Sequence, residues 1–180
     1  MATPKLSPQQ ILEVSGRVAG YIAAQREGYL PESQPLTRAQ SVPMNGFFLP
    51  EVLAAARVVV LNGARVQNPD FYPMLIHMGF TNLPDFSSMA AITFSDVVVS
   101  HGVLEDRTLF HELVHVEQYR QLGIQRFAEL YVRGFLDGGS YAAIPLEVNA
   151  YGLQGRFEQQ PHRRYSVADE VAAGIREGRF

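Results

Sequence analysis

Apolar residues recur at helical spacing along much of the chain, which predicts a structure rich in helices. A helix is expected over about residues 8–27, with Ser7-Pro8 capping its first turn and Gly28 ending it. This helix is expected to be structural and to pack one face on the core. The same spacing predicts further helices at about 50–56, 71–78, 124–136, 145–158 and 167–176.

The stretch from about 107 to 122 is predicted to be the central helix. Asp106 is the expected N-cap, and Gly123 is the expected residue just past the C-terminal end. Apolar residues occupy several sides of this helix, namely Leu109, Phe110, Leu113, Val114 and Val116. A helix of this kind is buried rather than half exposed. Its polar side chains therefore need partners inside the protein.

Short runs of β-branched residues predict a small sheet. Residues 58–61 read as a strand that ends at the turn signal Asn62-Gly63, and a second short extended piece is expected at 65–66. Residues 90–94 and 97–99 are strand-like, and the two residues between them can form a tight turn. A β-hairpin or one bent strand is therefore expected directly before the central helix.

These elements predict one α+β domain over residues 1–180. A small, partly antiparallel sheet or hairpin is expected to pack against the central helix and a helical C-terminal half. Residues 29–49 contain several prolines and few periodic apolar positions, so a long connection is expected there, either a loop throughout or a loop with one short turn of helix. A chain of 180 residues is long enough to bury a sizeable core.

Composition and charge narrow the choice of partners. The net charge is −3, the sequence pI is about 5.9, and Lys and Arg form no long cluster, so neither nucleic acid nor a membrane is an expected partner. The chain has no cysteine, which excludes disulfides and thiolate metal ligands. No apolar run resembles a signal peptide or a membrane span, so a cytoplasmic location is expected, although specialised export would leave no such mark. The oligomeric state is left open.

The predicted central helix carries the pattern His-Glu-x-x-His. His111 and His115 are four residues apart, about 400° of helix, so both imidazoles leave one face a single turn apart. Glu112 lies about 100° round from His111, which suits a carboxylate beside a metal ion rather than on it. This pattern is typical of zinc metallopeptidases. A buried helix with two incidental histidines is the alternative interpretation.

Catalytic zinc sites have three protein ligands and leave the fourth position to water. The extended motif with a third histidine is absent, because Gln118 and Gln121 occupy its Gly and His positions. A glutamate on a second helix is the alternative, and Glu147 near the start of the predicted 145–158 helix fits best. Glu129, on the intervening helix, and Asp137, in a Gly-rich break, are weaker candidates.

The segments His111-Glu-Leu-Val-His-Val-Glu-Gln118 and Pro145-Leu-Glu-Val-Asn-Ala-Tyr151 together resemble the gluzincin metallopeptidases, the His-His-Glu class that includes thermolysin. They resemble more closely a group of small bacterial metallopeptidase domains with an HELxHVxQ helix, some of them encoded with contractile injection systems. The resemblance covers about residues 57–158. It implies a zincin-like fold and a Zn²⁺ ion held by His111, His115 and Glu147.

One position departs from the thermolysin-like motif. That motif has an aspartate four residues after the glutamate ligand, where this chain has Tyr151. Support for His111 is then expected from Tyr151, Asn149 or a backbone carbonyl. The residue that stabilises the oxyanion does not follow from the motif, and Tyr151 is the first candidate, before Tyr141 and His101.

The resemblance implies hydrolysis of a peptide or protein substrate. Glu112 is expected to act as general base towards a metal-activated water and to deliver the proton to the leaving amine. The strand before the helix is a natural place for an extended peptide to add. The alternative is a zincin scaffold that binds metal and serves as a binding or structural module without peptidase activity. A hydrolase of non-peptide amides would share the same site.

Overall fold

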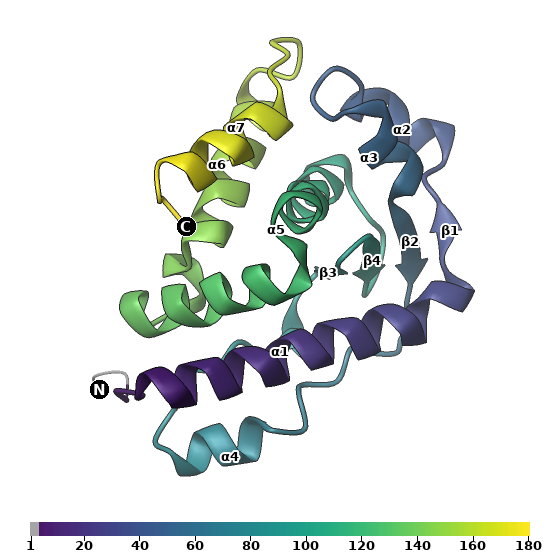
Figure 1. The fold of residues 1–180 in the computed structure, drawn as a ribbon. Coiled ribbons are helices and arrows are strands. Elements are labelled where there is room, and N and C mark those ends of the chain that lie inside the picture. The colour runs from purple at the N-terminus through teal and green to yellow at the C-terminus, as the bar shows by residue number, and fades with distance from the viewer. Residues whose placement is uncertain (1–3) are drawn as a thin grey trace.

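The computed structural model describes residues 4–180, in which helices and a small sheet form a mixed α+β fold (Figure 1). Its α-helices are α1 (Pro8–Tyr29), α2 (Arg38–Met44), α3 (Pro50–Ala55), α4 (Tyr72–His77), α5 (Asp106–Gly138), α6 (Pro145–Gln159) and α7 (Val167–Arg176). Its strands are β1 (Gln34–Pro35), β2 (Arg57–Val60), β3 (Ala91–Phe94) and β4 (Val97–Ser100). Three short 3₁₀ helices are η1 (Leu30–Glu32), η2 (Phe86–Ser88) and η3 (Tyr141–Ala143). The predicted α+β class is confirmed.

The sheet is mixed, with strand order β1-β2-β4-β3. β3 and β4 form the predicted hairpin, and Ser95 in its two-residue turn has a positive φ of 62°. β2 runs parallel to β4 and antiparallel to β1, which leaves β3 at one edge of the sheet. The expected extended piece at 65–66 is not a strand, because the Val66 N–H donates to the ring of His101 (2.9 Å) instead of to a neighbouring strand.

The segment 29–49, expected to be a long connection, is partly ordered into regular elements. α1 continues through Gly28 to Tyr29, so the predicted end of this helix was two residues early. The segment also contains β1 and α2. α2 begins with a capping box in which the Thr37 hydroxyl accepts from the Gln40 N–H (3.2 Å) and the Gln40 side chain accepts from the Thr37 N–H (2.9 Å).

The central helix α5 consists of two arms. Gly123 has φ 72° and ψ 162°, a non-helical conformation that glycine adopts without steric cost, so the helix predicted to stop here does so. The first arm (residues 106–122) and the second arm (residues 124–138) then continue in different directions, as Figure 1 shows. The N-cap is Glu105 rather than Asp106, which is instead the first helical residue, where its charge faces the positive end of the helix.

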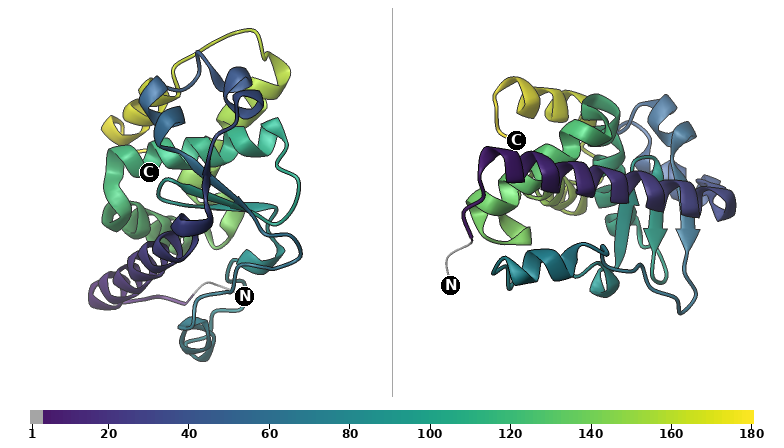
Figure 2. Two further views of the ribbon diagram at one scale, coloured as in Figure 1. Left: turned by 90° about the vertical axis from the view of Figure 1, so that its right-hand side faces the viewer. Right: turned by 60° about the horizontal axis from the view of Figure 1, so that its bottom comes forward.

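Two apolar clusters surround the first arm of α5. One contains residues of α1, the hairpin and the second arm of α5, among them Val14, Ile22, Phe94 and Phe127. In Figure 1, α1 lies between the second arm of α5 and α4, and the right-hand view of Figure 2 also shows α4 alongside α1.

The other cluster joins the first arm to α3, α6 and α7. At its centre the rings of Phe110 and Phe157 stack with centroids 4.5 Å apart, and Phe47 meets both edge-on. The first arm is therefore buried between both clusters, as its apolar pattern predicted. No helix within residues 4–180 has an apolar stretch long enough to cross a membrane.

Candidate metal centre

Three buried side chains from two helices converge on one point. His111 and His115 lie one turn apart on the first arm of α5, and their Nε2 atoms are 3.1 Å apart. Glu147 lies in the first turn of α6, and its Oε2 is 3.4 Å from each of these nitrogens. The structure thus brings together all three residues predicted as ligands. Within residues 4–180 they form the group of histidine and acidic side chains whose ligand atoms lie close enough together to hold a metal ion.

The size of this triangle fits a tetrahedral zinc ion. Atoms that each lie about 2.05 Å from a tetrahedral centre are about 3.3 Å apart. The observed edges of 3.1, 3.4 and 3.4 Å match this value closely. Two imidazole nitrogens and one carboxylate oxygen also form a common donor set of catalytic zinc. The donor atoms therefore need no rearrangement to coordinate a metal ion at one shared point.

The electrostatics of the cluster favour a positive charge between the three side chains. Burial alone would lower the pKa of His115, but the Glu147 carboxylate outweighs this effect and raises the pKa of His115 to about 9. Burial would likewise raise the pKa of Glu147, but the two imidazoles hold the pKa of Glu147 well below its usual range. Glu147 is 3% exposed, so its negative charge needs a cation nearby.

Gln118 holds His115 in position. Its Oε1 accepts a hydrogen bond from His115 Nδ1 (2.8 Å), which directs Nε2 towards His111 and Glu147. The Gln118 amide nitrogen donates to the Leu146 carbonyl (3.0 Å) and to Asn149 Oδ1 (3.1 Å), both on α6. One fully buried amide thus orients a histidine and ties its helix to the helix of Glu147. Sequence reasoning missed this role, although Gln118 follows His115 by one turn on a buried helix.

His111 has no comparable partner. Its Nδ1 is buried and makes no hydrogen bond to any residue within 4–180. A partner that orients the His111 ring was expected among Tyr151, Asn149 and the backbone carbonyls. Asn149 instead contacts Gln118, and the ring of Tyr151 packs against His111 with centroids 4.4 Å apart. Tyr151 is 50% exposed, so it covers His111 on the side that faces solvent.

Tyr141 contacts the third member of the cluster. Its hydroxyl donates to Glu147 Oε2 at 2.8 Å, the same oxygen that faces both histidines. Burial and the neighbouring Glu147 charge raise the pKa of Tyr141 well above its usual range, so the phenol keeps its proton. Tyr141 therefore stabilises the carboxylate by a hydrogen bond, a contact that the sequence did not specify.

Glu112 lies beside the cluster and is oriented by the sheet. The Thr93 hydroxyl on β3 lies 2.8 Å from Glu112 Oε2 and donates to it. Glu112, His115 and Glu147 all line one pocket, so the carboxylate faces the same space as the metal ligands. Thr93 gave no signal in the sequence because it is 19 residues away and on another element.

Two glycines on the second arm of α5 allow the start of α6 to approach. A Cβ atom on Gly134 would lie 2.5 Å from Pro145 Cδ, and one on Gly138 would lie 2.5 Å from the Cβ of Ala143. Only glycine leaves room for this contact. Because Glu147 lies two residues after Pro145, the same contact sets the position of the third ligand.

Three other candidates are not part of the cluster. Both ring nitrogens of His101 bind backbone groups, Nδ1 the Met89 carbonyl (2.5 Å) and Nε2 the Val66 N–H (2.9 Å), which gives this residue a structural role. Glu129 pairs with Arg126 and Arg133 on the surface. Asp137, the last of the three, is not in the ligand group.

Comparisons of the chain with known protein families, with curated proteins and with solved structures find no match.

Proposed function

We propose that this protein is a zinc-dependent peptidase of the gluzincin type with a zincin-like fold. The observation that carries the proposal is the triangle of His111, His115 and Glu147, whose edges match tetrahedral zinc. A carboxylate that is held beside this triangle, but is not part of it, completes the arrangement. That combination is suited to hydrolysis by a metal-activated water.

When bound, a zinc ion lowers the pKa of its water ligand to about 7 and polarises the carbonyl that is attacked. The Glu112 carboxylate accepts the proton of this water and passes it to the leaving amine. Thr93 holds one oxygen of Glu112, which leaves the other free to move the proton. We propose the half-exposed Tyr151, whose ring packs against His111, as the donor of a hydrogen bond to the developing oxyanion.

β3 lies at one edge of the sheet, and each of its four residues is buried. The two-residue turn makes Phe94 and Val97 a hydrogen-bonded pair, so the backbone groups of Ala91 and Thr93 point away from β4. Because β3 is an edge strand, these groups face away from the sheet, and Thr93 also contacts Glu112. A substrate strand paired here would lie alongside the proposed general base.

A metal-binding scaffold without peptidase activity is the second candidate. It is favoured by the burial of the site, since His111, Glu112, His115 and Glu147 are each at most 6% exposed. In this case the metal would stabilise the fold, and Glu112 would have no chemical role.

The test is the zinc content and peptide hydrolysis of protein purified without added metal. We expect stoichiometric zinc in the wild type and in Glu112→Gln, and its loss in His111→Ala, with the exposed His162→Ala as control. Hydrolysis should be lost in Glu112→Gln and kept in the exposed Glu158→Gln. Zinc without hydrolysis in the wild type would favour the scaffold, whereas a folded, zinc-free wild type would contradict both candidates.

A further inference from the structure

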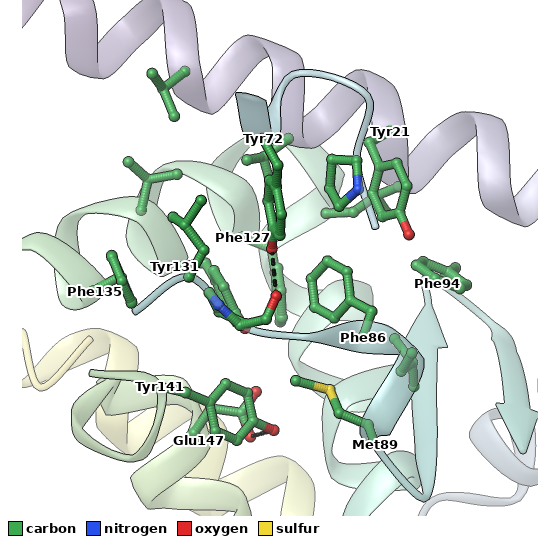
Figure 3. A pocket seen from close by; sticks show the side chains of 18 of the residues that line it. Tyr21, Tyr72, Phe86, Met89, Phe94, Phe127, Tyr131, Phe135, Tyr141 and Glu147 are labelled. Atoms are coloured by element: carbon green, nitrogen blue, oxygen red, sulfur yellow. Dashed lines mark hydrogen bonds between the residues drawn. The ribbon is translucent and has the colours of Figure 1, made fainter. Parts of the chain in front are cut away.

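An apolar pocket of about 110 Å³ opens beside the metal cluster (Figure 3). Its walls come from α1, the segment 69–89, β3 and the second arm of α5. In the view of Figure 3, Glu147 and Tyr141 lie on the side of the pocket away from α1, and Met89 lies near them. The pocket thus leads from the metal ligands towards the N-terminal helix, which was expected to be only structural.

The charged groups of the pocket are confined to the metal cluster. Of the lining residues within 4–180, those with a carboxyl or imidazole group are Glu112, His115 and Glu147. Two tyrosine hydroxyls of the walls are already engaged, Tyr21 with the Gln67 carbonyl (2.6 Å) and Tyr72 with the Pro84 carbonyl (2.8 Å). A charged group entering the pocket would find no counter-ion on its apolar walls, at a substantial cost in free energy.

The volume of the pocket limits the size of its occupant. An apolar cavity of about 150 Å³ accommodates benzene. The pocket of about 110 Å³ therefore suits a smaller apolar group. A branched aliphatic group of about four carbons, such as the side chain of leucine, fits this limit, whereas a long acyl chain exceeds it.

We propose that this pocket selects the substrate by binding an uncharged, branched aliphatic side chain next to the bond that is hydrolysed. The proposal rests on the proposed function, because Glu112, His115 and Glu147 form one end of the pocket. It gives α1 a direct role in substrate binding, through Val18 and Tyr21. Peptides with a leucine-like residue next to the hydrolysed bond are then substrates. Peptides with a lysine or glutamate at that position are excluded.

Binding can be followed without hydrolysis through labelled methionine methyl groups in nuclear magnetic resonance. Met89 lines the pocket, while Met44 is fully buried in the other apolar cluster and serves as an internal control. The probes are isocaproamide, which is neutral and branched, and δ-aminovaleramide, which is cationic and of similar length. We expect isocaproamide to shift the Met89 signal saturably, to leave Met44 unchanged, and to bind at least about tenfold more tightly than the cationic probe.

Two substitutions on one helix provide a matched pair. Val18→Phe fills the pocket from α1, whereas Leu12→Phe adds an aromatic ring at a position of α1 that is 61% exposed. Binding of isocaproamide should be lost in Val18→Phe and kept in Leu12→Phe. If Val18→Phe does not fold, Ala91→Val reduces the pocket from β3 instead. Equal binding of both probes, or unchanged binding in the pocket-filling variants, would overturn the proposal.

The zinc and hydrolysis measurements keep this proposal separate from the proposed function. If zinc and hydrolysis are absent but Met89 responds as expected, the peptidase is wrong and the ligand class of the pocket stands. If the protein hydrolyses peptides but does not prefer leucine over lysine at least about tenfold, the peptidase stands and the pocket proposal is overturned.

Discussion

Gln118 Oε1 accepts a hydrogen bond from His115 Nδ1 at 2.8 Å, and the amide nitrogen of the same side chain donates to α6. A neutral residue thus takes the place at which many zinc sites have a carboxylate. It orients the imidazole without adding negative charge beside Glu112 and Glu147. The orientation of one ligand is thereby coupled to the position of the helix that carries another.

Replacing Gln118 by methionine should therefore weaken zinc binding. Gln118→Met keeps a similar volume but removes both the acceptor for His115 and the donor to α6. Loss of such a contact costs about 10–100-fold in metal affinity. Competition with a chelator measures the zinc dissociation constant, and the exposed Gln125→Met on the same helix is the control. An unchanged constant in Gln118→Met would show that this bond does not orient the ligand.

Thr93→Val should reduce hydrolysis without releasing zinc. Valine has nearly the same shape as threonine but cannot donate to Glu112 Oε2. General base catalysis contributes about 10²–10⁴-fold to the reaction rate. A Glu112 carboxylate that Thr93 no longer orients should therefore lower kcat about tenfold. Zinc content and kcat are measured in parallel, with the exposed Thr81→Val as control. A loss of zinc together with rate would point to damage of the ligand helix instead.

Zinc should raise the thermal stability of the protein through Glu147. At a free zinc concentration 100 times the dissociation constant, binding to the native state alone adds about 2.7 kcal/mol to the free energy of unfolding. For a protein of this size, this is a rise in Tm of about 5–10 °C. Removing zinc with a chelator should reverse the rise in the wild type and change little in Glu147→Gln. A rise of the same size in both proteins would place the zinc elsewhere.

Gly134→Ala should destabilise the fold and weaken zinc binding. The new Cβ would lie 2.5 Å from Pro145 Cδ, so α6 has to shift together with Glu147. Such overpacking costs about 1–3 kcal/mol of unfolding free energy, measured by urea denaturation. Gly152→Ala on α6 meets nothing within 4 Å and should instead stabilise the protein by up to about 1 kcal/mol. If both variants behave alike, the close approach of the two helices is not required.

The parts of the site that could be predicted from sequence are those that depend on local geometry. The spacing of His111 and His115 on a helix fixes their common face, and the apolar pattern around them indicated a buried helix. The third ligand, Glu147, could be proposed only by elimination among distant carboxylates. The structure brings it into reach through the contact of Gly134 and Gly138 with the start of α6, which was not predicted from the sequence.

What could not be predicted depends on contacts between distant elements. Thr93 and Tyr141 acquire their roles because the sheet and η3 pack against the two ligand helices. His101 was a candidate for stabilising the oxyanion, but both of its ring nitrogens bind backbone groups. Within the segment 29–49 the sequence indicated at most a short turn of helix at no specified position, because the prolines there obscure the helical signal of the capping box that begins α2.

Glu147 follows His115 by 32 residues along the chain. The Gly123 bend and the whole second arm of α5 lie between them. A metal ion held by His111, His115 and Glu147 would act as a cross-link that closes this stretch into a loop. Closing a loop of this length reduces the entropy of the unfolded chain, so such a link stabilises the native state. The ligand set exists only after both arms of α5 and the start of α6 have assembled, which makes metal uptake a measure of folding itself.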